Sequence, residues 1–139
     1  MKARTTFPTL LLCALALVVG LSACGSKVST SNFKGEQHAV AQAVSNLQSH
    51  ATALEATKIC REDFARANVA RLNATAEGCK KAVETQLKEI DSFEVTVESV
   101  QINGDHATAR VQSIHSGKKR IGTMALVKEA GKWRISGVS

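Results

Sequence analysis

Apolar positions divide the chain into a helical first part and a strand-rich second part. In residues 36–56, apolar side chains recur every three or four positions, which is the period of an amphipathic helix. Residues 57–72 carry a second, less regular helical pattern, and Asn73 or Thr75 can cap a third helix with one apolar stripe. The apolar positions of the three predicted helices are Val40, Val44, Leu47, Ala51 and Leu54, then Cys60, Phe64, Ala67, Val69 and Leu72, then Cys79, Val83, Leu87 and Ile90.

Beyond residue 91 the hydrophobic period changes to two, which is typical of half-buried strands. Phe93, Val95 and Val97 alternate with polar residues, and the alternation then slips at Ser99. Because a slip of one residue moves the apolar side chains to the other face, it predicts a bulge where the sheet bends. Asn103-Gly104 is the signal for a two-residue hairpin at the end of this strand.

Three further strands complete the predicted sheet. They span residues 106–115, 120–128 and 132–138, with turns at Gly117-Lys118 and Ala130-Gly131. Because the helices precede the strands, the pattern predicts an α+β fold, with three N-terminal helices packed on a bent four-stranded antiparallel sheet.

The N-terminus reads as an export signal. Lys2 and Arg4 precede an uncharged apolar stretch at residues 10–20, which would form a helix of roughly 16 Å and so reach about half-way across a bilayer core. Leu21-Ser22-Ala23-Cys24 follows and resembles the bacterial lipobox, in which the Cys receives diacylglycerol and becomes the first residue after cleavage. The alternative is that this segment is the cleavage region of an ordinary secretory signal.

The lipobox resemblance implies a division of the chain into three parts. Residues 1–23 are expected to be a cleaved signal peptide, residues 24–35 a flexible tether that starts at lipidated Cys24, and residues 36–139 a single domain. The protein is then exported and carries palmitate-type acyl chains that anchor it to the outer face of the bacterial cytoplasmic membrane, or to the outer membrane of a host that has one.

Composition sharpens this interpretation. The 139 residues, 44% of them apolar, suit one ordinary globular domain. The net charge of +6 falls to +4 when Lys2 and Arg4 leave with the signal, since 16 basic residues then face 12 acidic ones. Nucleic acid is an implausible partner for an exported protein, so the basic balance does not indicate one.

Two cysteines, Cys60 and Cys79, remain once Cys13 leaves with the signal and Cys24 is acylated. In an oxidising compartment such a pair most often forms a disulfide, and two buried free thiols are the alternative. A metal site is disfavoured, because the chain has no Cys-x-x-Cys and no His at ligand spacing from either Cys. We expect no metal and no cofactor.

The end of the chain carries a family resemblance. Residues 103–107 (NGDHA) and 126–135 (LVKEAGKWRI) are similar to the end of many small bacterial lipoproteins with a nuclear transport factor 2-like, or cystatin-like cone, domain. The resemblance covers residues 36–138 and implies a sheet that curls around a helix to form a conical pocket. Members include enzymes and binding modules, so fold alone does not assign an activity. The absence of Tyr disfavours the ketosteroid isomerase-like subclass, whose oxyanion site uses one.

Candidate catalytic groups are scarce. His106 and His115, with Asp105 or Glu98, could serve acid–base chemistry, but surface or hairpin roles are the favoured interpretation of these residues. His38 and His50 are 12 residues apart on one predicted helix and cannot form a site by themselves.

A basic run at Lys118, Lys119 and Arg120 suits contact with anionic lipid head groups or envelope polymers, although a solvated turn would have the same composition.

The sequence thus predicts a non-enzymatic, membrane-anchored envelope lipoprotein whose domain binds a small apolar ligand or an envelope protein. Two alternatives stay open: a small envelope enzyme of the cone superfamily that uses His and Asp as acid–base residues, and an interaction module that forms a homodimer through its sheet.

Overall fold

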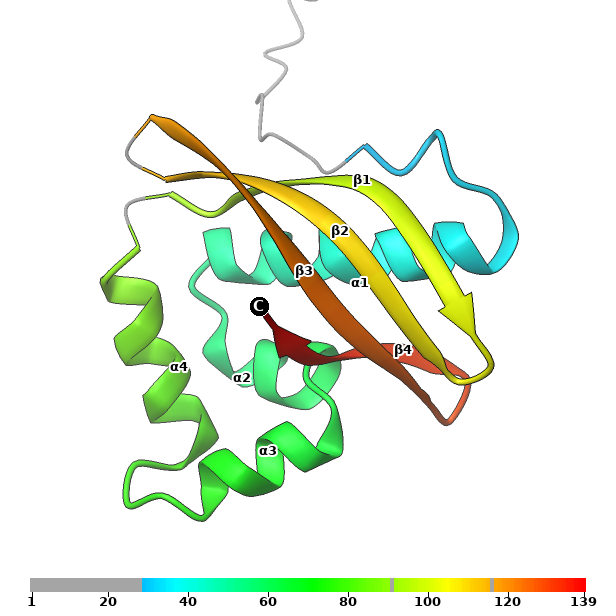
Figure 1. Cartoon of the computed structure of the whole chain (residues 1–139). Coiled ribbons are helices and arrows are strands. Elements are labelled where there is room, and N and C mark those ends of the chain that lie inside the picture. The colour runs from blue at the N-terminus through cyan, green and yellow to red at the C-terminus, as the bar shows by residue number, and fades with distance from the viewer. Residues whose placement is uncertain (1–28, 91, 116) are drawn as a thin grey trace, which may run out of the picture.

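The computed structural model describes residues 29–90, 92–115 and 117–139 (Figure 1). The predicted signal peptide, the lipobox and Cys24 lie outside these residues. The helices are α1 Gly35–Thr52, α2 Ala56–Lys58, the π-helix η1 Ile59–Asp63, α3 Arg66–Asn73 and α4 Gly78–Lys88. The strands are β1 Glu94–Asn103, β2 His106–His115, β3 Lys118–Glu129 and β4 Lys132–Val138. Among the described helices, none combines the length and the apolar character that a membrane crossing requires.

The strands form one antiparallel sheet in the order β1-β2-β3-β4, as the period of two predicted. The register of β1 against β2 shifts between Val97 and Ser99, so the predicted bulge is confirmed. A second shift, between Ala125 and Leu126 of β3, lies opposite β4. These shifts bend the strands, and the sheet curves over α1 (Figure 1).

The space between α1 and the sheet is filled with apolar side chains. Val40, Ala41 and Val44 of α1 are fully buried, in one cluster with Leu126 and Ile135 from the sheet. Complete burial of a Val, Leu or Ile side chain stabilises the fold by roughly 1.5–3 kcal/mol. The concave face of the sheet is therefore apolar and packed, so any ligand site is to be sought at the rim of the cone.

The first helix is shorter than its apolar pattern predicted. It ends at Thr52, and Leu54 adopts a left-handed backbone with φ of 56°. This turn carries Leu54 out of the apolar stripe, where we expected it, and leaves its side chain 64% exposed.

The predicted second helix, residues 57–72, is wrong as one continuous element. α2 and η1 stop before Phe64, and the backbone at Phe64 and Ala65 is extended before α3 begins. Phe64 forms a parallel bridge with Ile135 of β4, and the Ala65 amide donates to the Ile135 carbonyl at 2.9 Å. Because β4 satisfies the backbone groups of this segment, the helix is interrupted where the chain reaches the sheet.

Two turns differ in position from the prediction. The first hairpin pairs Asn103 with His106, so its loop is Gly104-Asp105 and not Asn103-Gly104. Gly104 has φ of 59°, and glycine at the first loop position suits a type II′ turn. β3 begins at Lys118 and not at residue 120, because Lys118 already pairs with His115.

The turn at Ala130-Gly131 is confirmed, with φ of 48° and 77° at its two residues.

A disulfide ties the helices together. Cys60 of η1 and Cys79 of α4 are bonded, which is the pairing expected from the sequence, with their Cα atoms 6.1 Å apart. Asn73 supports the same junction, because its Oδ1 atom accepts a hydrogen bond from the Cys79 amide at 2.9 Å. The N-cap of α4 is Glu77, so Asn73, at the end of α3, satisfies an amide in the first turn of α4 from outside the cap position, while the Thr75 hydroxyl donates to the Leu72 carbonyl.

The outer edge of β1 is covered by glutamines of α1. The Val95 amide donates to Gln48 Oε1 at 3.0 Å, and Gln37 Nε2 donates to the Val100 carbonyl at 3.1 Å. These side chains take the place of a neighbouring strand and satisfy backbone groups that would otherwise be open.

Candidate functional site

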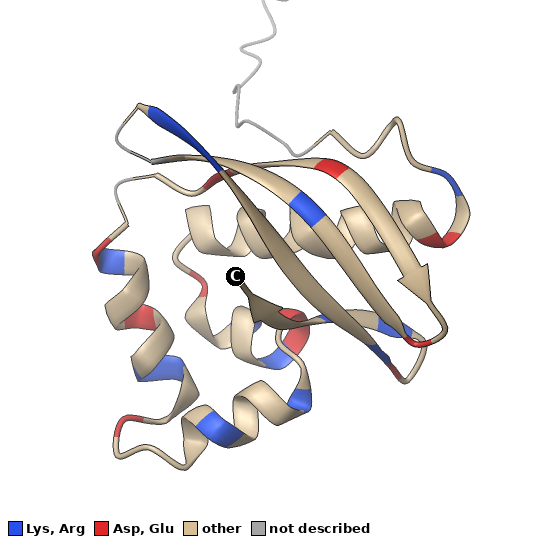
Figure 2. Ribbon diagram, in the orientation of Figure 1, with Lys and Arg blue, Asp and Glu red and all other residues tan. Residues whose placement is uncertain are grey.

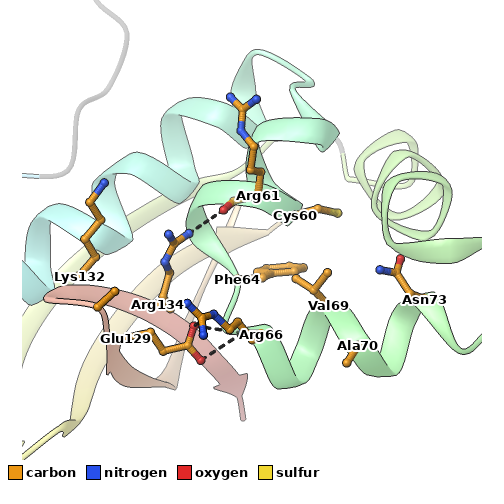
Figure 3. Close-up of a pocket in the computed structure, with 11 residues that line it drawn as sticks. Cys60, Arg61, Phe64, Arg66, Val69, Ala70, Asn73, Glu129, Lys132 and Arg134 are labelled. Carbon is orange, nitrogen blue, oxygen red and sulfur yellow. Dashed lines mark hydrogen bonds and ion pairs between the residues drawn. The ribbon is translucent and has the colours of Figure 1, made fainter.

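Two clefts lie beside η1 and β4, and both are lined by Arg61, Lys132 and Arg134. We call them the basic cleft and the histidine cleft. The basic cleft, shown in Figure 3, measures about 570 Å³ and the histidine cleft about 940 Å³. Both volumes fall within the usual range of small-molecule sites.

The basic cleft has an apolar side formed by η1 and α3. The Phe64 ring faces Val69, with the sulfur of Cys60 nearby, and Ala70 continues this surface (Figure 3). The extended segment that contacts β4 positions Phe64 there. α3 begins directly after this segment, at Arg66. The aromatic surface of the cleft thus depends on the break in the predicted second helix.

Glu129, the carboxylate that lines the basic cleft, is already engaged. Its two carboxylate oxygens accept from the Arg66 amide at 3.2 and 3.3 Å, and its Oε2 atom lies 3.9 Å from Arg66 Nε. A carboxylate at this place caps the first turn of α3 and interacts favourably with its helix dipole.

Two cations of the basic cleft have no acidic partner. Arg134 Nη1 donates to the Arg61 carbonyl at 2.8 Å, a neutral acceptor (Figure 3). Within the described ranges, neither Arg134 nor Lys132 forms an ion pair. Figure 2 shows that Lys and Arg positions of α3 and β4 surround this side of the domain. The basic cleft therefore combines an apolar surface with uncompensated positive charge.

The histidine cleft lies between α1, η1 and β4. His38, Gln42, Asn46 and His50 line it from α1, Glu62 and Asp63 from η1, and residues 131–134 from β4 and its preceding turn. Gln42 Nε2 donates to Asn46 Oδ1 at 3.0 Å on its wall.

A part-buried contact between His50 and Asp63 joins α1 to η1 in the wall of this cleft. His50 Nδ1 lies 2.8 Å from Asp63 Oδ2, and the side chains are 19% and 3% exposed. Burial raises the pKa of the Asp63 carboxyl, while the hydrogen bond from His50 and the charges of His50 and Arg134 act in the opposite direction. A carboxylate bonded to Nδ1 fixes the orientation of the ring and leaves Nε2 as its second nitrogen.

The other carboxylate of the histidine cleft, Glu62, is paired with the Arg61 guanidinium. The hydrogen bond from Arg61 lowers the pKa of Glu62. Both carboxylates that line the cleft are thus committed to neighbours, as Glu129 is in the basic cleft.

Trp133 lines the histidine cleft and is tied to the start of α1. Its Nε1–H donates to Glu36 Oε2 at 2.8 Å, and Lys128 Nζ donates to Glu36 Oε1 at 2.9 Å. Lys128 also lies 5.7 Å from the centre of the Trp133 ring. The bonds from Lys128 and Trp133 lower the pKa of Glu36. Because Trp133 is the one Trp of the chain, its fluorescence reports on this region.

The residues singled out as weak catalytic candidates lie elsewhere. His106 and Asp105 are exposed in the β1–β2 hairpin, and Glu98 pairs with Arg110 at 2.9 Å. No hydrogen bond joins His106 to either carboxylate within the described part of the chain. His115 ends β2, and its side chain lies outside what the structure describes.

The basic run Lys118, Lys119 and Arg120 opens β3 and is exposed, at the end of the sheet where Figure 2 shows a continuous basic stretch. Among the residues that the structure covers, no group of three or more His, Cys, Asp or Glu side chains is arranged to hold a metal ion.

The contact between His50 and Asp63 is not predicted from the sequence. The pattern sets His50 on one helix with His38 and places Asp63 inside a continuous second helix. One signal was present: Asp63 stands between apolar Ile59 and Phe64 at a position that becomes buried. A buried carboxylate needs a partner, and His50 is the one that the break in the helix brings close.

Comparison with known proteins gives one family. A family model described as "Putative lumazine-binding" matches residues 31–137. No curated protein matches the chain. A solved "Putative NTF2-like transpeptidase" from Campylobacter jejuni is 14% identical, with 69% of this chain and 95% of that chain covered and a TM-score of 0.46. A designed NTF2-fold protein, NT-9, is 16% identical, with 81% and 87% covered and a TM-score of 0.43.

Proposed function

The chain belongs to the family described as putative lumazine-binding, and from that membership we propose that it is a non-enzymatic binding protein whose basic cleft takes a small, flat ligand. The ligand lies against the Phe64 ring and presents oxygen acceptors to Arg134 and Lys132. A homodimer that uses the sheet stays a prediction, which sedimentation at micromolar concentration would test.

The observation that carries this proposal is the pairing of an aromatic surface with two cations that have no acidic partner among the described residues. A flat heteroaromatic ring gains from offset stacking on Phe64 and from contact with a guanidinium plane. Carbonyl or ionised oxygens at its edge replace the water on Arg134 and Lys132. Apolar ligands without such oxygens leave both cations desolvated and unpaired, so they are disfavoured.

The test uses lumazine, a bicyclic ring with two carbonyl oxygens, titrated into the chain from residue 24 with Cys24→Ser to prevent acylation. We expect saturable heat of binding, and at least about a tenfold weaker affinity in Arg134→Gln, since a hydrogen bond to a charged group contributes roughly 1.5–3 kcal/mol. Arg71→Gln, on α3 outside both clefts, is the matched control and should bind as the parent does.

Two results would contradict the assignment of the basic cleft. One is the absence of saturable binding at millimolar lumazine. The other is an equal affinity of the Arg134→Gln and Arg71→Gln variants, which would place the ligand elsewhere.

We further propose that the domain is exported and held at the membrane by acyl chains on Cys24. The charged start, the apolar stretch and the Leu21-Ser22-Ala23-Cys24 segment support this, and they occur in the order that the bacterial lipobox requires. Two acyl chains anchor a protein stably, whereas one alone is marginal. The exposed run from Lys118 to Arg120 would add attraction to anionic head groups once the domain is tethered.

A further inference from the structure

The histidine cleft contains a nitrogen atom that the fold itself does not use. His50 Nδ1 is bonded to Asp63, and no other side chain or backbone group within the described residues bonds to Nε2. The His50 side chain is 19% exposed and lines the cleft, whereas that of Asp63 is 3% exposed. His50 therefore borders the cleft, and Nε2 is its ring nitrogen that is not bonded to Asp63.

The charges around this nitrogen are positive in sum. Arg61, Lys132 and Arg134 face two carboxylates, Glu62 and Asp63, of which the first is paired with Arg61 and the second with His50. Of the remaining titratable groups near the pair, His38 lines the same cleft from α1, and Glu55 and Lys58 pair with each other at 2.7 Å on α2. The groups of this cleft with unused hydrogen-bonding capacity thus include Lys132, Arg134 and His50.

We propose that the histidine cleft is a second binding site, which takes a small oxyanion (a carboxylate or a tetrahedral oxyanion) together with one proton on His50. The protonated ring donates from Nε2 to the anion and from Nδ1 to Asp63. Lys132 and Arg134 supply the further donors. A neutral His50 presents a lone pair at Nε2 and repels an oxygen anion, so binding and protonation favour each other.

The choice of an oxyanion as the ligand follows from the side chains that line the histidine cleft. Charge-assisted hydrogen bonds to oxyanions are the strong ones, and guanidinium, ammonium and imidazolium are all donors. A cation is disfavoured because both carboxylates are occupied by neighbours. The site shares Arg61, Lys132 and Arg134 with the basic cleft but not Phe64, and it does not depend on a flat ligand binding there.

The experiment uses the same soluble chain with sodium sulfate, whose charge is constant between pH 5.5 and 8. Sodium chloride of equal ionic strength controls for screening. Trp133 lines this cleft and not the basic cleft, so its fluorescence reports occupancy. We expect a saturable change in emission, with an affinity about tenfold higher at pH 5.5 than at pH 8. Sodium acetate, titrated at pH 6 and above, tests the carboxylate as the alternative oxyanion.

His50→Gln should remove most of this pH dependence, and His106→Gln, the same change in the exposed β1–β2 hairpin outside the cleft, should retain it. Proton uptake can also be measured on the parent chain, without any substitution. Calorimetry of the parent chain in two buffers of different ionisation enthalpy should show net proton uptake, of up to one proton per sulfate bound.

Three results would overturn the proposal: no saturable response to either anion, no proton uptake between pH 5.5 and 8, or equal pH dependence in His50→Gln and the parent. Because lumazine binding is measured separately, its failure leaves this test intact.

Discussion

Reduction of the Cys60–Cys79 disulfide should destabilise the domain strongly. The bridge joins residues 19 apart in sequence. In the chain-entropy model, closing a loop of that length removes about 11 cal/mol/K from the unfolded chain, or about 3 kcal/mol at 25 °C. The bridge also connects η1, which shapes both clefts, to α4, so its loss loosens the part of the fold that carries the candidate sites.

The assay is urea unfolding followed by Trp133 fluorescence, with the same preparation in its oxidised and reduced forms. We expect the free energy of unfolding to fall by about 3 kcal/mol on reduction, which corresponds to roughly 10–20 °C in melting temperature for a domain of this size. The Cys60→Ala/Cys79→Ala double variant provides a second measurement, and it should be at least as unstable as the reduced form because Cys79 is buried.

A loss below about 1 kcal/mol would refute the reasoning. It would mean that residues 60–79 are already held together in the unfolded chain, or that the oxidised fold is strained by a comparable amount. A free-thiol assay on the oxidised preparation is the necessary check, since two reactive thiols would show that the bridge was never formed.

Three further predictions concern individual residues. Hydrogen bonds from Lys128 and Trp133 lower the pKa of Glu36, so the stabilisation from this carboxylate is present above pH 4.5 and is lost as the pH falls through the lower pKa of the folded state. Acid titration should therefore shift the Trp133 emission of the parent chain. An equal shift in Glu36→Gln would contradict this prediction. The pKa of Asp63 is raised from 3.8, so the folded chain holds that proton more tightly, and this contribution to stability is present below 3.8 and lost as the pH rises through the higher folded value. Relative to Asp63→Asn, the parent should therefore gain melting temperature between pH 7 and 4, and parallel curves would count against it. Cells fed a palmitate analogue should label the parent protein and not Cys24→Ser; equal labelling would exclude this residue as the acylation site.

The hydrophobic pattern predicts the helices and strands that bury one regular apolar face, because such a face shows as a period of apolar residues in the sequence. α1 and the four strands have one apolar face each, and the bulge at Ser99 shows in the sequence because it reverses that face. The disulfide could be predicted for a different reason: an oxidising compartment was expected, and two cysteines remained to pair in it.

The clefts could not be predicted, because each depends on contacts between distant segments. The helix is interrupted at Phe64 by a strand some 70 residues later in the chain, and no local propensity indicates that bridge. The contact of His50 with Asp63 arises only once this interruption has fixed η1 against α1. Lys132 and Arg134 alternate with Trp133 and Ile135 along β4, so their period identifies them as outward-facing without indicating which helix they would meet.

The covered sheet edges limit how this protein can assemble. At one edge, Gln37 and Gln48 occupy positions that an incoming strand would need, and at the other the segment around Ala65 does the same. If acyl chains hold the domain at a membrane, as proposed above, its copies are confined to a thin layer, where neighbours meet far more often than in solution. In that setting an open edge would recruit copies into growing ribbons, and these side chains block that route. Self-association through the faces of the sheet or through the helices is not opposed by these contacts.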